Sequence, residues 1–329
     1  MLVHLSDCRA GPRTSSGCSL IAAMDPVSTT TPLFSIVIAA YNDWAPLEQC
    51  LRSLAQQISG PSFEVIVVDD GSREAMPGFI NDWTHCYPLT IVRQPHAGIA
   101  AARNRGAQIS QGKVLVFVDA DCKLQPGCLA ALSKTVAQHP QHSCFQLHLT
   151  GDCSGIVGRA EELRLATLQN HLLQPSGRIR YLNTAGFAIR RERVDIEAGV
   201  FDPTAVRAED TLLLANLMKT RELPLFVPDA TVQHAISLSL MACFRKDIRS
   251  AHLDAGAYDM IAAQGVRLRV GQQERLRMLL AMWKTSGQPS IGRSAWFVVA
   301  ARQAPRMIVI FLRSITLWGF RKARSNQTR

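Results

Sequence analysis

Hydrophobic and polar positions in the first half of the chain follow the pattern of an α/β protein. Apolar, β-branched runs of strand length occur at residues 34–40, 63–68, 89–92 and 114–118. Stretches with a helical period lie between them, at residues 47–58 and 98–109. Because strands alternate with helices, the pattern predicts a mostly parallel sheet with helices on both faces.

Polar residues follow all four predicted strands: Tyr41 and Asn42, Asp69 and Asp70, His96 and Gly98, Asp119 and Asp121. The carboxyl ends of parallel strands meet at one edge of a sheet, where ligands bind in this class of fold. Any one of these groups could be turn chemistry, but four such strand ends together favour a nucleotide site. An ordinary dinucleotide-binding fold is disfavoured, because no Gly-X-Gly-X-X-Gly follows the first strand.

Asp119 and Asp121 come directly after the central strand, at positions i and i+2. On extended backbone their carboxylates project from the same side. Carboxylates combined with the oxygens of a diphosphate are typical ligands of Mg²⁺ or Mn²⁺. The pair therefore predicts half of a metal and phosphate site, and the alternative is a solvated strand end with turn-forming acids.

The composition is that of a globular protein, with 47% hydrophobic residues in a chain of 329. Nine cysteines without a Cys-X-X-Cys pair fit reduced thiols better than a disulfide framework or a structural zinc site. The charge is uneven, because residues 264–329 hold 13 Lys and Arg against one acid while the remainder is close to neutral. A basic tail predicts a polyanionic partner, either nucleic acid or an anionic membrane surface.

Six segments, taken in their order and spacing, carry a resemblance to a known family. They are residues 39–42 (AAYN), 68–72 (VDDGS), 96–106 (HAGIAAARNRG), 118–121 (VDAD), 183–191 (NTAGFAIRR) and 201–203 (FDP), followed by Glu209 and Asp210. Together they resemble the family 2 glycosyltransferases of the GT-A fold, and the likeness covers roughly residues 34–236. The fold implied is a Rossmann-like, mostly parallel sheet flanked by helices.

The resemblance implies a nucleotide-binding set made of Ala39, Tyr41, Asn42, Asp70, Arg103, Asn104 and Asp119. Within this set, Tyr41 and Asp70 line the nucleoside pocket, and Asp70 receives the imino proton of a uracil-like base. This favours a UDP-sugar. Arg103 and Asn104 face the nucleotide from the helix after the third strand, and the alternative for Arg103 is a solvated helix face.

The same resemblance implies the metal and catalytic residues. Asp121 binds Mg²⁺ or Mn²⁺, Asp119 serves the ribose or the metal shell, and His234 is a third metal ligand. Asp210 is the general base, and Glu209 orients the helix start or the acceptor. Two alternatives stay open: acids are favoured in the first turn of any helix, and a lone histidine is usually a core or surface residue.

The predicted organisation has three parts. Residues 1–32 form a disordered leader, in which a start at Met24 would remove two cysteines without affecting the fold. Residues 33–236 form the glycosyltransferase domain, with a nucleotide-binding half at 33–122 and an acceptor half at 123–236. The acceptor half is expected to hold helices at 157–173 and 209–217 and a strand-like stretch at 178–190.

Residues 237–329 are expected to form a helical extension. Its last apolar stretch, from Ala295 to Phe320, is interrupted by arginines and a proline, so an interfacial helix on an anionic membrane is favoured over a spanning helix. Nucleic acid is disfavoured as a partner, because the arginines are interleaved with long aliphatic stretches. The expected location is cytoplasmic, peripheral on the inner face of the cell membrane.

The function that we predict is inverting transfer of a single sugar from a nucleotide diphosphate sugar to a glycan, lipid-linked or other cell-envelope acceptor. A polymerising synthase is disfavoured, because the chain has no Gln-X-X-Arg-Trp element. Two alternatives are a non-catalytic nucleotide-sugar-binding protein and a nucleotidyltransferase. The latter would need a glycine-rich phosphate loop after the first strand, and residues 40–46 hold no glycine.

Overall fold

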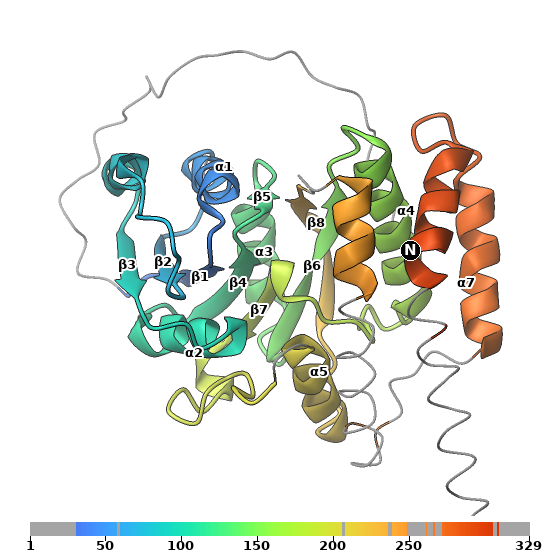
Figure 1. Ribbon diagram of the computed structural model, residues 1–329. Helices are drawn as coiled ribbons and strands as arrows, with labels where there is room; N and C mark the ends of the chain where they lie inside the picture. Colours follow the sequence, from blue (N-terminus) through green and yellow to red (C-terminus); the bar gives the residue numbers. More distant parts are fainter. Residues whose placement is uncertain are drawn as a thin grey trace, which may run out of the picture.

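The structure is a computed structural model that describes residues 31–57, 60–205, 208–235, 239–248 and 272–304, with the single residues 261, 266 and 308. The predicted leader and the end of the predicted interfacial helix therefore lie almost wholly outside the described residues, as does the predicted boundary after residue 236. One sheet of eight strands, in the order β3-β2-β1-β4-β7-β6-β8-β5, forms the centre of the molecule (Figure 1).

The strands are β1 Phe34–Ala40, β2 Phe63–Asp69, β3 Leu89–Arg93, β4 Val114–Asp119, β5 Cys122–Leu124, β6 Cys144–Gly151, β7 Phe187–Arg190 and β8 Leu225–His234. The labelled α-helices are α1 Trp44–Ala55, α2 Ile99–Ile109, α3 Cys128–Gln138, α4 Ile156–Leu172, α5 Glu209–Lys219 and α7 Gln272–Thr285. Short 3₁₀ segments are η1 Gly78–His85, η2 Thr184–Gly186 and η3 Arg191–Arg193. Residues 240–248 and 293–304 are also helical.

The parallel half of the sheet consists of β1, β2, β3 and β4, as the pattern of apolar runs predicts. β1 pairs with β2 on one side and with β4 on the other, all parallel. The register places Ala39 beside Asp119 and Ala40 beside Asp69. The polar residues that follow these strands are therefore delivered to one edge of the sheet.

Helices cover both faces of this half, because successive side chains of a strand point to opposite faces. Ile36 and Ile38 of β1 pack with α1 and α3 in one buried cluster. Val37, between them, packs with α2 and α5 in another. Each cluster takes alternate residues of the same strands, which fixes the register that brings the strand ends together.

The second half of the sheet is mixed. β6 and β8 are parallel, β7 is antiparallel to β4 and to β6, and β5 is antiparallel to β8. Of the stretch 178–190 expected to be strand-like, only Phe187–Arg190 is a strand. The Asn183 side chain accepts a hydrogen bond from the Ala185 N–H at 2.9 Å and begins a 3₁₀ turn instead.

Strand β6 was missed by the sequence reasoning, although all eight of its residues are buried. Polar residues alternate with apolar ones in Cys144–Gly151. This sequence pattern is typical of a strand with one solvent-exposed face, but here both faces are buried. Gln146 shows how burial is tolerated here: its side-chain amide donates to the Gly186 carbonyl at 2.9 Å and accepts from the Asn183 N–H at 2.8 Å.

The described part of the C-terminal extension is helical, as predicted, and packs on the sheet domain through α4. Ala160 and Leu163 of α4 contact Met282 of α7 and Val298 and Val299 of the last described helix in one buried cluster. Figure 1 shows these helices stacked beside α4 at the end of the molecule away from β3. Among the described helices, none has the length and apolar character needed to cross a membrane.

The close approach of α2 to the sheet gives a stability prediction. A Cβ built on Gly106 would clash with Cγ1 of Val37 in β1. We expect Gly106→Ala to lower the free energy of unfolding by about 1–2 kcal/mol in a urea titration, because overpacking outweighs the gain in helix propensity. Gly78→Ala is the control, since no heavy atom lies within 4 Å of its added Cβ. Equal stability of wild type and Gly106→Ala would contradict this packing.

Candidate active site

Arg103 on α2 is a buried cation that holds two carboxylates from distant parts of the chain. One guanidinium nitrogen donates to Oδ1 of Asp119 at 2.6 Å, and the other donates to Oε1 of Glu209 at 2.5 Å. The side chain is only 2% exposed. Burial alone would lower the pKa of Arg103, but the two carboxylates raise it, so the charge is kept. Arg103 therefore joins the end of β4 to the start of α5, and the expectation that it faces the nucleotide stays a prediction.

Asn104, the next residue on α2, forms a structural link, and its predicted contact with the nucleotide stays a prediction. Its Nδ2 donates to the Phe201 carbonyl at 2.7 Å, and its Oδ1 accepts from the Phe201 N–H at 2.9 Å. Both ends of the amide are used, and the residue is 8% exposed. Asn104 therefore fixes the loop before α5 on the back of α2.

Asp70 organises the loop that leads from β3 into α2. One carboxylate oxygen accepts from the Ala97 N–H at 2.9 Å and from Nε2 of Gln94 at 2.8 Å. The other accepts from the Gly98 N–H at 2.9 Å and pairs with Nδ1 of His96 at 2.8 Å. With four donors and a buried side chain, this carboxylate is satisfied by the protein. The expectation that Asp70 also receives the imino proton of the base stays a prediction.

Tyr41 lies in a position suited to a nucleoside. Its ring stacks on that of His96, with centroids 4.4 Å apart and planes inclined by 29°. Asn42, which adopts a positive φ of 57°, accepts from the Arg73 N–H at 2.8 Å and donates its own N–H to Oγ of Ser72 at 2.9 Å. Asn42 therefore ties the loop after β1 to the loop after β2, beside an aromatic surface.

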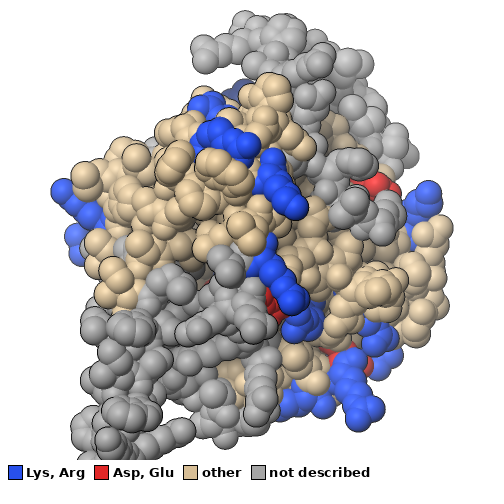
Figure 2. Space-filling model, turned by 90° about the vertical axis from the view of Figure 1, so that its right-hand side faces the viewer, with Lys and Arg blue, Asp and Glu red and all other residues tan. Residues whose placement is uncertain are grey.

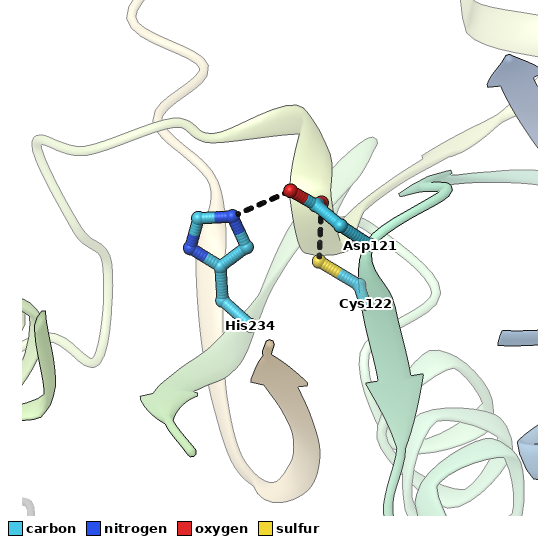
Figure 3. Close-up of side chains that lie close together, drawn as sticks. All are labelled: Asp121, Cys122 and His234. Atoms are coloured by element: carbon cyan, nitrogen blue, oxygen red, sulfur yellow. Dashed lines mark hydrogen bonds and ion pairs between the residues drawn. The ribbon is translucent and has the colours of Figure 1, made fainter. Parts of the chain in front are cut away.

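Asp121 and His234 come together although 113 positions separate them in the chain. β5 and β8 are antiparallel with Cys122 beside His234, so the two side chains meet across the pair. Nε2 of His234 lies 3.2 Å from Oδ2 of Asp121 (Figure 3). Oδ1 of Asp119 accepts a hydrogen bond from Arg103 while 30% of its side chain is exposed, and its role at the ribose or in the metal shell stays a prediction.

Cys122 belongs to the same group and was missed by the sequence reasoning, although it directly follows Asp121. Its Sγ is 3.8 Å from Oδ1 of Asp121 (Figure 3). Burial, together with the negative charges of Asp121 and Asp119, raises the pKa of this thiol well above its usual range. Cys122 therefore stays protonated and orients Asp121, while the carboxylate and the imidazole supply the donors.

A further carboxylate, that of Glu161, completes the surroundings of His234. Its Nδ1 lies 3.5 Å from Oε1 of Glu161 on α4. Burial alone would lower the pKa of His234, but the carboxylates of Asp121 and Glu161 raise it to about 10. An oxygen and a nitrogen donor of this kind fit a divalent cation such as Mn²⁺, which would compete with the proton on the ring. Carboxylates on both sides of the ring are the usual surroundings of a metal-binding histidine.

Asp43 was also missed, and it extends the negative charge of the edge. Although it lies near the surface, partial desolvation and then the charge of Asp121 raise its pKa, with a smaller contribution from Asp119. Lys246, on the helix at 240–248, opposes this effect. Three carboxylates and one ammonium group therefore act on one another at the carboxyl ends of β1 and β4.

Glu209 and Asp210 begin α5 and have different surroundings. Glu209 is 8% exposed and pairs with Arg103, an arrangement that suits its predicted role at the helix start, and the alternative role toward the acceptor stays a prediction. Asp210 accepts hydrogen bonds from the N–H and Oγ1 of Thr211, at 2.6 and 3.0 Å. Burial and the adjacent charge of Glu209 raise the pKa of Asp210 to about 6, against the opposing effects of Thr211 and Arg103.

The fold is that of an α/β domain with an acidic site at the carboxyl ends of its parallel strands, as in nucleotide-binding α/β proteins. Comparison with known proteins gives its family. Residues 35–197 match the model of Glycosyl transferase family 2 and place the chain in that family. An uncharacterized glycosyltransferase of Haemophilus influenzae is 35% identical over 109 residues, which are 33% of this chain and 36% of that protein. The matches span about a third of the length of such curated relatives.

Solved structures agree on the fold. The mannosyltransferase PcManGT of Pyrobaculum calidifontis, in complex with GDP-Man and Mn²⁺, aligns with a TM-score of 0.55 over 85% of this chain and 88% of its own, at 17% identity. Residues 1–349 of TarS from S. aureus, in complex with UDP, give 0.52 over 84% and 89% at 17% identity. At this identity the likeness establishes the GT-A fold, which confirms the predicted fold class.

The Arg103 bridge gives the prediction for this site. Arg103→Met removes the cation that lies between Asp119 and Glu209, leaving two carboxylates uncompensated. We expect the free energy of unfolding to fall by about 3–5 kcal/mol, measured by urea denaturation followed by circular dichroism. Arg105→Met is the matched control, because Arg105 is exposed on the same helix and its loss should change stability by about 0.5 kcal/mol or less. Similar stabilities of the two variants would show that the bridge is dispensable.

Proposed function

We propose that this protein is an inverting glycosyltransferase that moves one sugar from a nucleotide diphosphate sugar to an acceptor hydroxyl. The observation that carries the proposal is the pair of functional positions fixed by Arg103. Arg103 holds Asp119 and Glu209. Asp121, which pairs with His234, lies two residues after Asp119, and Asp210 lies directly after Glu209. A donor end and an acceptor end of one reaction are thus tied to a single guanidinium.

Asp210 is the general base of the proposed reaction. Its carboxylate removes the proton of the acceptor hydroxyl while the acceptor oxygen forms a bond to the anomeric carbon. The bond from that carbon to the diphosphate oxygen breaks on the opposite side, and the configuration is inverted. A pKa of about 6 suits this role, because the group is ionised at neutral pH and basic enough to take a proton.

Asp121 and His234 would hold the divalent cation, which supplies positive charge to the leaving diphosphate when bound. The aromatic pair of Tyr41 and His96 supports stacking of the base. The predicted contact of Asp70 with a uracil-like base favours a UDP-sugar as the donor. The Mn²⁺ of the mannosyltransferase complex supports Mn²⁺ as the first cation to test.

A non-catalytic nucleotide-sugar-binding protein is the second candidate. It would keep the base-binding and cation-binding residues but would have no need of a carboxylate with a raised pKa at the start of α5. The properties of Asp210 therefore favour the enzyme. Cation-dependent hydrolysis of nucleotide sugars, screened over a panel of donors, separates the two candidates.

We also propose a membrane-facing surface, which we call the aromatic face and define as Leu280, Trp283, Trp296 and Phe297. Three of its side chains are exposed to 55% (Leu280), 39% (Trp283) and 59% (Phe297). The three rings pack edge to face, with centroids 5.1 to 6.2 Å apart. Exposed aromatic residues of this kind are typical of contact with a lipid interface.

The charges around the aromatic face support an anionic lipid surface as its partner. Residues 272–304 contain five bases and one acid, Glu274, and that acid pairs with His171 and Arg180. The guanidinium of Arg293 lies 4.1 Å from the centroid of the Trp283 ring. Figure 2 shows Lys and Arg side chains spread over this side of the molecule, with few acidic ones between them. Each base near such a surface contributes about 1 kcal/mol.

The proposed base is tested with Asp210→Asn. We expect the turnover number to fall by about 10²–10⁴-fold, while the dissociation constant of the nucleotide diphosphate in a calorimetric titration stays unchanged. Asp202→Asn is the control, because Asp202 is exposed in the loop before α5 and should keep full activity. Loss of nucleotide binding in Asp210→Asn, or a product that keeps the anomeric configuration of the donor, would overturn the assignment.

The pKa of Asp210 gives a pH dependence. A base must be ionised, so turnover should be constant above the pKa and should decrease tenfold per pH unit below about 6. Asp210→Asn should lack this acidic limb, because the amide does not titrate. An unchanged limb in the variant would assign the dependence to another group.

The aromatic face is tested with Phe297→Ser in sedimentation with anionic phosphatidylserine vesicles. Loss of the exposed ring should weaken partition by roughly tenfold, which corresponds to about 1.4 kcal/mol, and binding should weaken further in high salt. Met76→Ser is the control, since Met76 is 41% exposed in a different part of the fold. Equal loss in both variants, or equal binding to neutral vesicles, would contradict the proposed surface.

A further inference from the structure

Glu161 on α4 is a buried carboxylate that the proposed reaction does not use. The residue is 3% exposed, and its oxygens meet three cationic groups. Arg164 donates to it twice, at 2.9 and 2.5 Å. Nδ1 of His234 lies at 3.5 Å and a guanidinium nitrogen of Arg302 at 3.7 Å. A buried charge is costly to keep, so this arrangement calls for an explanation.

The position of Glu161 relative to His234 supplies one. The imidazole lies between two carboxylates, with Asp121 on Nε2 at 3.2 Å and Glu161 on Nδ1 at 3.5 Å. A carboxylate on the second nitrogen fixes the plane of the ring and the nitrogen that is free to bind a cation. Arg164 keeps Glu161 in place, because it holds both carboxylate oxygens from one turn farther along α4.

Arg302 extends this arrangement to the C-terminal helix. Its Nε donates to Oδ2 of Asp247 at 2.7 Å, while another of its nitrogens lies 3.7 Å from Glu161. Asp247 belongs to the helix at 240–248, and Arg302 belongs to the helix at 293–304 that carries Phe297. One guanidinium therefore joins two helices of the extension to the carboxylate behind His234.

We propose that Glu161 is a positioning residue that orients His234 for the divalent cation, and that Arg302 helps to hold Glu161 in that position. This inference rests on the cation site of the proposed function. Glu161 touches neither substrate nor cation in this scheme. It acts through His234, and its loss should change the affinity for the cation more than the turnover at saturating cation.

The direct test is Mn²⁺ binding by the full-length protein, followed by the electron paramagnetic resonance signal of free Mn²⁺. We expect Glu161→Gln to weaken Mn²⁺ binding by about 10–100-fold, because the amide keeps the size of the side chain and loses its charge. Glu162→Gln is the matched control. Glu162 is the next residue, equally buried at 1% exposure, and accepts from the Gly151 N–H at 2.7 Å, so its loss should leave Mn²⁺ affinity close to that of wild type.

Activity gives the second measurement. In Glu161→Gln the Mn²⁺ concentration for half-maximal transfer should rise, and kcat at saturating Mn²⁺ should remain near that of wild type. Arg302→Met should show the same change to a smaller degree and serves as the test if Glu161→Gln does not fold. Unchanged Mn²⁺ affinity in a folded Glu161→Gln or Arg302→Met, or an equal loss in Glu162→Gln, would overturn the inference.

Asp121→Asn separates this inference from the function on which it rests. If wild type and Asp121→Asn bind Mn²⁺ equally, the cation site itself is wrong, and the positioning role of Glu161 is overturned with it. If Asp121→Asn alone loses Mn²⁺, the cation site stands and the role of Glu161 does not. Loss of Mn²⁺ binding in both Asp121→Asn and Glu161→Gln, with Glu162→Gln unaffected, supports the inference.

Discussion

The buried guanidinium of Arg103 is the interaction on which the arrangement of the site depends. It joins Asp119, where β4 ends, to Glu209, where α5 begins, at 2.6 and 2.5 Å. A guanidinium that is 2% exposed stays charged, and its burial is costly without both partners in place, so neither the strand end nor the helix start is free to shift alone. The residues of proposed function, Asp121 and Asp210, lie two positions and one position beyond these partners, so their separation is set by the bridge.

The same interaction contributes to the electrostatics of the proposed base. Burial and then the charge of Glu209 raise the pKa of Asp210, while the hydrogen bonds of Thr211 and the charge of Arg103 lower it, so that it lies at about 6. Both members of the ion pair therefore act on the neighbouring carboxylate, with opposite signs. A pKa of about 6 is within the range that suits a base.

The elements that depend on local pattern were predictable, and the partners of polar groups were not. The parallel strands and their polar ends follow from apolar runs and turn residues, and the Asp121 and His234 pair was expected from the family resemblance. Asp70, Arg103 and Asn104 have side chains that suit a nucleotide, and their partners in the fold lie 16 to 106 residues away. No local pattern shows that such a group has partners inside the fold. Strand β6 does carry a local signal, the alternation of polar and apolar residues, but only the fold shows that Gln146 is made compatible with burial by distant backbone groups.

The last described helix, at residues 293–304, links the proposed aromatic face to the surroundings of the proposed cation site. Its Val298 and Val299 pack on α4, its Arg302 reaches the carboxylate behind His234, and its Phe297 is exposed in the aromatic face. Residues on one short helix thus contribute to the core, to the charge network of the site and to the exposed surface. Because a helix moves as a rigid unit, a displacement of Phe297 at the surface would also displace Arg302, which lies 3.7 Å from Glu161. Sequence periodicity alone identifies an amphipathic helix here, but only the fold shows that its polar residue points to the site.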